Sequence, residues 1–230
     1  MSAMDAKRDS AAARIRSRVL RSTDRFWHPT DFDGPAGAVD AALSRLAREG
    51  ELRRVRRGLY WRGRKTLLGM APPAPESVAR ELVGPFGVGP AGMNAASALG
   101  LSTQIPARAV IAVPTRAPTD TPSIRFVDRS GREGRARARL RPTEVALLEV
   151  LEDPFRFIEL TSDEVTERMS DLIDEGELDP ARLSKAAASE PARIRERLRT
   201  LFRSVGRAND ADAIPGRRVL ARTAEIPSPA

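Results

Sequence analysis

Seven side chains between residues 44 and 57 are the first candidates for chemistry in this sequence. Arginine guanidinium groups bind phosphate through paired N–H donors, and serine or arginine side chains can also contact the edges of bases. These residue types, gathered in so short a stretch, predict contact with a polyanion such as nucleic acid. The candidates are Ser44, Arg45, Arg48, Arg53, Arg54, Arg56 and Arg57.

The charge distribution favours the same interpretation. The chain has 230 residues and a formal net charge of +8. Residues 1–65 contain 16 Lys and Arg against 8 Asp and Glu, whereas residues 66–230 contain 23 of each. Clustered cations gain affinity for phosphates by releasing condensed counterions. The excess therefore predicts an N-terminal module for nucleic acid, and the alternative is that arginine is simply the common surface cation here.

Two helices are expected to position the first of these residues. Apolar residues recur every three or four positions in residues 11–21, and again from Ala36 to a stop at Gly50. This spacing predicts two amphipathic helices, the second of which presents Ser44, Arg45 and Arg48 on its polar face. A short turn with Thr30 as its N-cap is expected between them.

A hairpin is expected to position the arginines that follow. Residues 52–55 and 59–61 each combine apolar and basic residues and predict two short strands. Gly58 supplies the positive φ that a tight turn requires. Three helices followed by a basic hairpin is the plan of a winged helix-turn-helix, whose third helix enters the major groove while the hairpin contacts phosphates. Leu52, Val55 and Leu59 are expected to anchor this hairpin to the helices.

The remainder of the chain predicts a second domain of mixed α/β structure with a helical end, so the fold class is α+β. Residues 107–115 and 122–129 have the pattern of strands, and residues 193–202 that of a last amphipathic helix. The expected division is 1–70 for the winged helix-turn-helix, 71–76 for a proline-rich linker, 77–205 for the C-terminal domain and 206–230 for a flexible tail.

A second basic patch is expected in that domain, because arginine occupies every second position of a strand-like run. These residues are Arg135, Arg137, Arg139 and Arg141. Such a face either protects a sheet edge from pairing or contacts nucleic acid or a partner. Residues 144–179 follow with 13 acids and two bases, and predict an acidic helical surface that meets a basic partner or keeps the domain in solution.

The sequence lacks the residues that several classes of function require. The chain contains no cysteine, which excludes disulfides, cysteine-ligated zinc and a thiol nucleophile. Its one histidine, His28, has no sequence partner for catalysis. Gly87, Gly89 and Gly92 match G-x-G-x-x-G, but no strand precedes them, so a structural turn is expected. We therefore expect no enzyme activity, metal or cofactor. With a polar start and no apolar run near about 18 residues, a cytoplasmic location without membrane contact is expected.

The stretches "AVDAALSRLAREGELRRVRRGLYW" (38–61) and "NAASALGLSTQIP" (94–106) resemble the AbiEi family of antitoxins from type IV toxin–antitoxin (abortive infection) operons. The resemblance extends to "ALLEVLEDP" and "GELDPARL" near the C-terminal end. It implies an N-terminal winged helix that represses its own operon and a C-terminal domain that neutralises a cognate nucleotidyltransferase-like toxin. "WRGRKTLLG", after Tyr60, departs from the short proline-containing linker of the family.

Promoter DNA with repeated sites is the expected partner besides the toxin, because one winged helix of about 65 residues makes few base contacts and two copies are needed for specificity. Two alternatives stay open at this point. One is a plain winged-helix transcriptional regulator whose C-terminal domain senses a small ligand. The other is an RNA- or tRNA-binding accessory protein that uses both basic patches.

Overall fold

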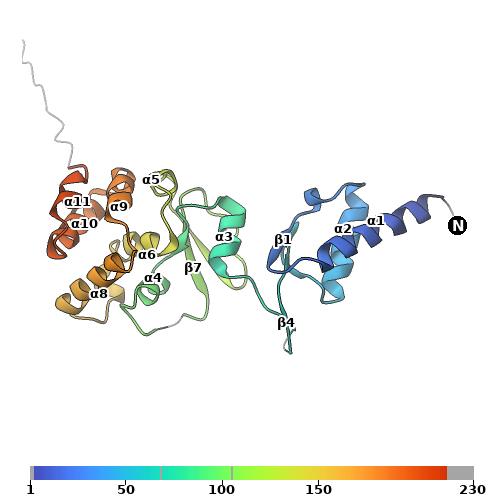
Figure 1. Cartoon of the computed structure of the whole chain (residues 1–230), viewed down its shortest axis with the longest axis horizontal. Coiled ribbons are helices and arrows are strands. Elements are labelled where there is room, and N and C mark those ends of the chain that lie inside the picture. Colours follow the sequence, from blue (N-terminus) through green and yellow to red (C-terminus); the bar gives the residue numbers. More distant parts are fainter. Residues whose placement is uncertain (1–2, 68, 105, 217–230) are drawn as a thin grey trace, which may run out of the picture. The chain divides into compact units, whose positions relative to one another are not determined.

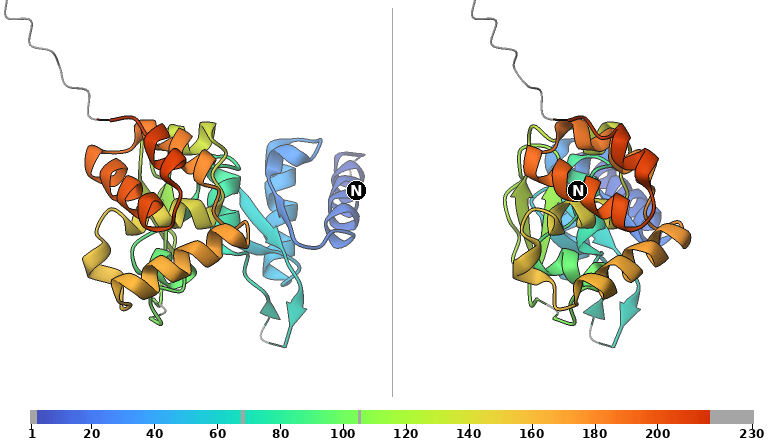
Figure 2. Two further views of the ribbon diagram at one scale, coloured as in Figure 1. Left: turned by 60° about the vertical axis from the view of Figure 1, so that its left-hand side comes forward. Right: turned by 90° about the vertical axis from the view of Figure 1, so that its left-hand side faces the viewer.

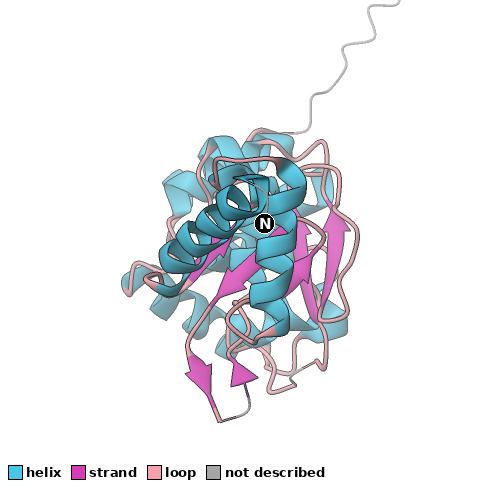
Figure 3. Ribbon diagram, turned by 90° about the vertical axis from the view of Figure 1, so that its right-hand side faces the viewer, coloured by secondary structure: helices cyan, strands magenta, loops and turns pink. Residues whose placement is uncertain are grey.

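The computed structural model describes residues 3–67, 69–104 and 106–216, with the side chains of residues 3–10 left undescribed. In this part of the chain it shows eleven α-helices, two 3-10 turns and three small sheets (Figures 1 and 3). The fold is therefore of mixed α and β type. The contacts divide the chain into two compact units, which we call the N-terminal unit (to Gly84, with Pro118–Arg125) and the C-terminal unit (Pro85–Ala117 and from Phe126 onward).

The N-terminal unit begins with two α-helices and a three-stranded antiparallel sheet. In chain order its elements are α1 (Ala3–Leu20), β1 (Arg25–Trp27), the 3-10 turn η1 (Pro29–Asp31), α2 (Ala36–Arg48), β2 (Arg53–Arg56), β3 (Leu59–Arg62), β4 (Lys65–Thr66), β5 (Gly69–Met70) and α3 (Pro75–Val83). The sheet has the order β1-β3-β2, and β4 and β5 form a separate hairpin. Figure 1 shows α1 and α2 side by side, in agreement with their mutual packing.

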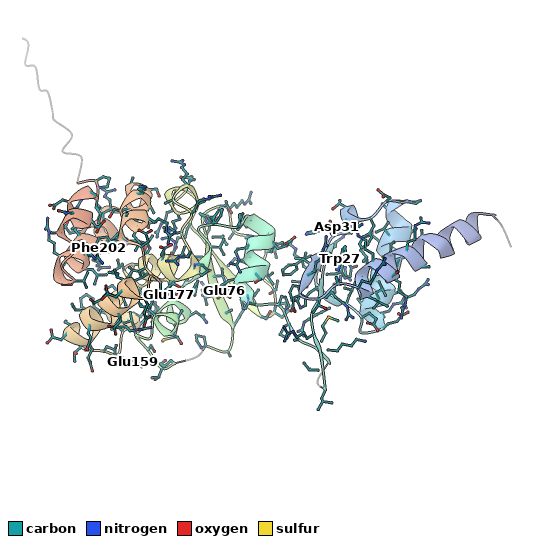
Figure 4. The ribbon with its side chains drawn as sticks, viewed as in Figure 1. Trp27, Asp31, Glu76, Glu159, Glu177 and Phe202 are labelled. Carbon is teal, nitrogen blue, oxygen red and sulfur yellow. The ribbon has the colours of Figure 1, made fainter. Side chains whose placement is uncertain are left out.

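One apolar core holds α1, α2 and the sheet together. It is built from Ile15, Val19, Trp27, Val39, Ala42, Leu43, Leu46, Leu52 and Tyr60. Trp27 is 1% exposed; its ring stacks on Phe32 at 5.0 Å between centroids, and its Nε1 donates to Ser22 Oγ. Figure 4 labels Trp27 beside Asp31, whose carboxylate accepts the backbone N–H of His28 at 2.7 Å. Tertiary packing of this kind supplies most of the stability of short helices.

The helix and hairpin expected from the sequence are confirmed. Helix α2 spans Ala36–Arg48, and Gly50 follows it with φ +72°. Strands β2 and β3 flank Gly58, which also has φ +72°. Leu52 and Leu59 are buried as expected, and Val55 is half-buried. The middle helix of the expected three is only the single turn η1, whose sequence lacks the length for an α-helix.

The C-terminal unit is mainly helical. Its elements are β6 (Gly89–Pro90), α4 (Met93–Ala98), β7 (Ala109–Val113), β8 (Ile124–Asp128), α5 (Gly134–Arg137), α6 (Pro142–Val150), α7 (Pro154–Phe157), α8 (Ser162–Asp174), α9 (Pro180–Ala186), the 3-10 turn η2 (Ala187–Ser189), α10 (Ala192–Ser204) and α11 (Ala208–Ala213). The strands form a sheet of order β6-β7-β8. The strands expected at 107–115 and 122–129 are confirmed as β7 and β8. The turn expected over Gly87–Gly92 is wrong in part, because Gly89 and Pro90 form strand β6, which pairs with β7.

Helix α6 lies at the centre of this unit, since all but its first two residues are buried. Around it pack the apolar faces of α4, α8, α9, α10 and α11, and Figure 2 shows the last four of these helices gathered together. Phe202 of α10, labelled in Figure 4, is 1% exposed. Among the described residues, no helix is both long and apolar enough to cross a membrane.

Two boundaries differ from those expected. The contact division falls after Gly84 and not within 71–76; His28 Nε2 meets Glu81 Oε1 of α3 at 2.9 Å inside the N-terminal unit. The start of the expected tail, residue 206, is too early, because α11 covers 208–213 and buries Ala211 and Ile214 against the core. Residues 217–230 lie outside the described residues.

Candidate nucleic-acid interface

Helix α2 presents Arg45 and Arg48 to solvent as neighbours on its exposed face. Arg48 is exposed on the flank of Ser44, whose hydroxyl lies 3.2 Å from the Tyr60 hydroxyl of β3. Arg45 is also exposed, about 60° further round the helix, where it lines a shallow depression between α1 and α2. Arg48 therefore lies nearer than Arg45 to the side of α2 that meets the sheet.

The hairpin does not hold its four arginines on one face. Arg54 pairs with Tyr60 and Arg56 with Leu59, and a bulge at Val55 separates the two pairs. Paired residues of an antiparallel ladder share a face, while successive residues alternate. Arg54 therefore shares the Tyr60 face, toward α2, whereas Arg56 lies on the Leu59 face.

Arg53 and Arg57 take the remaining two positions. Arg53 pairs with Trp61 and so lies on the same face as Arg56; its Nη1 donates to the Met70 carbonyl at 3.3 Å. Arg57 is exposed in the turn beside Gly58. Ser44 and Arg54 thus lie on the side where α2 meets the sheet, Arg45 and Arg48 lie on the exposed face of α2, and Arg53 and Arg56 lie on the other face of the hairpin.

The guanidinium groups of five candidate arginines have no partner in the part of the chain that the structure describes. Among the described residues, no side-chain hydrogen bond or ion pair is made by Arg45, Arg48, Arg54, Arg56 or Arg57. Glu51, the acid next to this group, is held by Lys65, whose Nζ donates to Oε1 at 2.7 Å and lowers the pKa of Glu51 below its ordinary value. Glu49 pairs with Arg16. These arginines remain available to an external anion.

The second basic patch, expected on an exposed strand, is not present as expected. The strand expected at Arg135–Arg141 is wrong, because residues 134–137 form the short helix α5. Arg135 is fully buried and pairs with Glu149 Oε1 at 2.7 Å and with Glu190 Oε1 at 2.7 Å. Arg141 donates from Nη2 to the Gly176 carbonyl at 2.5 Å. Alternating arginines therefore do not form one exposed face.

The other two arginines of that run are exposed, in different settings. The Arg139 guanidinium lies over the Phe86 ring, 4.7 Å from its centroid, and its backbone has φ +55°. Arg137 makes no ion pair within the described residues.

Arg135 and its neighbours pair with Glu149 of α6, with Glu152 just after α6 and with Glu190. Burial on its own would raise the pKa of Glu149, but the hydrogen bonds from Arg129 and the charge of Arg135 outweigh burial and hold this pKa below its ordinary value. Arg132 bridges Glu152 and Glu190, at 3.2 Å from each. Part of the acidic stretch at 144–179 therefore meets a basic partner within its own chain.

The "GLSTQ" segment forms a loop that is held by hydrogen bonds. Gly100 has φ +74°, and Leu101 beyond it is 1% exposed. The Glu159 carboxylate, labelled in Figure 4, accepts the Thr103 backbone N–H at 3.0 Å and the Gln104 side-chain amide at 2.7 Å. These bonds lower the pKa of Glu159. The conspicuous residues of this motif are therefore bonded to one another and to the segment between α7 and α8.

No metal-binding cluster of His, Asp or Glu exists in the described part of the chain. His28 is bonded through its ring to Glu81.

Comparisons with known proteins give a family-model match and similarity to solved structures. Residues 27–119 match a family of unknown function (DUF6088). The crystal structure of the RV2827C protein from Mycobacterium tuberculosis is similar, with 18% sequence identity, coverage of 89% of this chain and 80% of that chain, and a TM-score of 0.49. The search of curated proteins found no match.

Proposed function

We propose that this protein is a DNA-binding repressor and antitoxin of the AbiEi type. In this proposal the N-terminal unit is a winged helix-turn-helix that binds repeated sites in the promoter of its own operon. The C-terminal unit neutralises a cognate nucleotidyltransferase-like toxin. No catalytic group of the chain takes part in either activity.

The observation that carries the DNA proposal is the set of guanidinium groups without protein partners. Arginines on a protein surface can pair with acids, and Glu49 and Glu51 directly precede the hairpin in the sequence. Both acids are instead engaged by Arg16 and Lys65. Guanidinium groups without a partner among the described residues suit phosphate, which they bind through two parallel N–H donors.

The order of elements supports the same proposal. A helix, a strand, a helical turn, a second helix and an antiparallel hairpin follow one another, and the first strand pairs with the second strand of the hairpin. In a winged helix the helix before the hairpin is the one that enters the major groove. That position belongs to α2, so Ser44 and Arg48 would face base edges and Arg54 the adjoining phosphates.

The antitoxin role is supported by the resemblance of residues 38–61 and 94–106 to the family. Its test is co-expression with the neighbouring nucleotidyltransferase gene, read as growth. Cells that carry the full-length protein should grow, and cells that carry the toxin alone should not. The variant R53A/R54A/R56A/R57A should still rescue growth when expressed from a foreign promoter. Failure of the wild-type protein to rescue would refute the antitoxin role and leave DNA binding untouched.

The DNA role is tested by footprinting on the promoter of the same operon. We expect protection of two repeats by two protein copies, lost in R54A/R57A and kept in R116A/R125A. The control removes two exposed arginines that lie outside the hairpin. Protection of a single half-site at saturation would count against the repeated-site arrangement, and equal protection by R54A/R57A would count against the hairpin.

A further inference from the structure

A depression in the C-terminal unit has the chemistry of an anion site. It lies between α5 and the α9–η2 segment and has a volume of about 280 Å³. Its lining residues are Gly134, Arg137, Ala138, Lys185, Ala188 and Ser189. Two cations from separate helices thus border it, and no acid contributes to its lining.

The chain itself leaves these two cations uncompensated. Neither the Arg137 guanidinium nor the Lys185 ammonium bonds to another residue in the described parts of the structure. The nearest acids along the chain are occupied. Glu133 accepts the Gly131 backbone N–H at 3.2 Å, and buried Glu190 binds Arg135. The positive charge of the depression therefore remains available to a ligand.

The walls of the depression are fixed in place. The Gly134 backbone N–H donates to Ser189 Oγ at 3.0 Å, and that hydroxyl donates to the Ala186 carbonyl at 3.2 Å. A Cβ on Gly134 would lie 2.7 Å from the same carbonyl, so only glycine allows this close approach. The buried Arg135–Glu190 pair also joins α5 to the residue that follows η2. A ligand would meet preorganised walls, which lowers the cost of binding.

We propose that this depression binds a phosphate group, with Arg137 supplying paired N–H donors and Lys185 a compact positive charge. Phosphate oxygens match the N–H geometry of a guanidinium, and the negative charge of phosphate can neutralise two cations. The volume lies at the lower end of the range of ligand sites, about 300 Å³ and above, and fits a phosphate or pyrophosphate better than a whole dinucleotide. The site does not rest on the DNA and antitoxin proposals, because it uses other residues in the other unit.

The test is calorimetric titration of the full-length protein with pyrophosphate. The wild-type protein should bind, and R137Q/K185Q should bind at least about tenfold more weakly, since charge-assisted hydrogen bonds are removed. The matched control R116Q/R125Q removes two exposed arginines outside the depression and should bind like the wild type. R137K/K185R keeps both charges but moves the paired N–H donors to position 185, so it should bind more tightly than R137Q/K185Q and less tightly than the wild type. Its measurable binding separates an effect on binding from an effect on folding.

A parallel titration with a short duplex DNA distinguishes the source of the phosphate. If R137Q/K185Q has a lower affinity for DNA than its control while no protein binds pyrophosphate, the site takes phosphates of a nucleic-acid backbone. If all four proteins show the same affinity for pyrophosphate and the same affinity for DNA, the proposal is overturned.

Discussion

Two groups of arginines in this chain look alike in sequence and behave in opposite ways. The hairpin group, Arg53–Arg57, contains four arginines, and most of their guanidinium groups have no protein partner in the described part of the chain. The group at Arg129–Arg135 contains three, of which Arg135 is fully buried and all three bind carboxylates of α6 or Glu190. One group is available to a partner molecule, and the other is part of the interior.

The difference lies in the acids that the fold brings within reach. The first 65 residues contain half as many acids as bases, whereas the second group is followed at once by the 13 acids of residues 144–179. Burial of an arginine is destabilising unless acceptors, carboxylates above all, bind its N–H groups. Arginine density is therefore an indicator of nucleic-acid binding only where acids are scarce in the same unit.

The largest effect that follows from this comparison is on stability. The variant R135M leaves Glu149 and Glu190 buried without their shared partner, which should lower the free energy of unfolding by about 3–5 kcal/mol. The variant R137M on the same helix removes an exposed arginine and should change it by less than about 0.5 kcal/mol. Urea unfolding followed by circular dichroism measures both. Equal stabilities of R135M and R137M would contradict the interior role of Arg135.

The chain offers an internal control for that experiment. Both tryptophans, Trp27 and Trp61, belong to the N-terminal unit. Tryptophan fluorescence therefore follows unfolding of that unit, while circular dichroism is dominated by the helices of the other. R135M should shift the dichroism transition more than the fluorescence transition.

Acid should weaken the same cluster. Because the pKa of Glu149 is lower in the folded chain than the ordinary value of 4.5, its ionised form stabilises the fold. That contribution is complete above about pH 4.5 and disappears as the pH falls through the folded-state pKa. Midpoints of urea unfolding between pH 7 and pH 3 should therefore fall more steeply for the wild type than for E149Q. Parallel profiles would show that Glu149 contributes no such linkage.

A smaller effect is expected at the face of α2. R48A should weaken binding to promoter DNA by about 1–3 kcal/mol and binding to scrambled DNA much less, because base contacts specify while phosphate contacts do not. R45A should cost less, since Arg45 lies on the flank of α2 beside α1. Fluorescence anisotropy with both duplexes makes the comparison. A larger effect of R45A than of R48A would require another orientation of α2 on DNA.

Short-range sequence patterns predicted individual helices and strands. Helix α2 and the β2–β3 hairpin were predictable because apolar spacing is a property of a short window and Gly50 and Gly58 mark their ends. The bulge at Val55 was not predictable, because a bulge depends on the register of two strands. This bulge nevertheless decides which arginines share a face. Its consequence is that four neighbouring arginines divide into two sets.

The error at Arg135–Arg141 has a long-range cause. Alternation at every second position satisfies the pattern of a strand, and a helix of four residues is too short to show its own period. The partners that bury Arg135 lie 14 and 55 residues further along the chain. The depression beside Arg137 was equally hidden, since Lys185 comes from another helix.

A repeated motif shows the same limit. "SRLAREGEL" (44–52) and "SDLIDEGEL" (170–178) end two helices in the same way, with Gly50 at φ +72° and Gly176 at φ +74°. In both, the final leucine donates its backbone N–H to the leucine six residues earlier. Strand β2 begins after the first motif, whereas helix α9 begins at Pro180 after the second motif. The motif encodes a helix end and not the element that follows.

The central claim is that the hairpin arginines lie along DNA phosphates. Its most direct test is the slope of log affinity against log salt concentration for the wild type, R53A/R54A/R56A/R57A and the control R116A/R125A, each with promoter and scrambled duplex. We predict that the slope shrinks by about 0.9 for each phosphate that the four-arginine variant no longer neutralises. Most of this decrease should be reproduced by R54A/R57A, and preference for the promoter should persist. An unchanged slope in the four-arginine variant would contradict the claim.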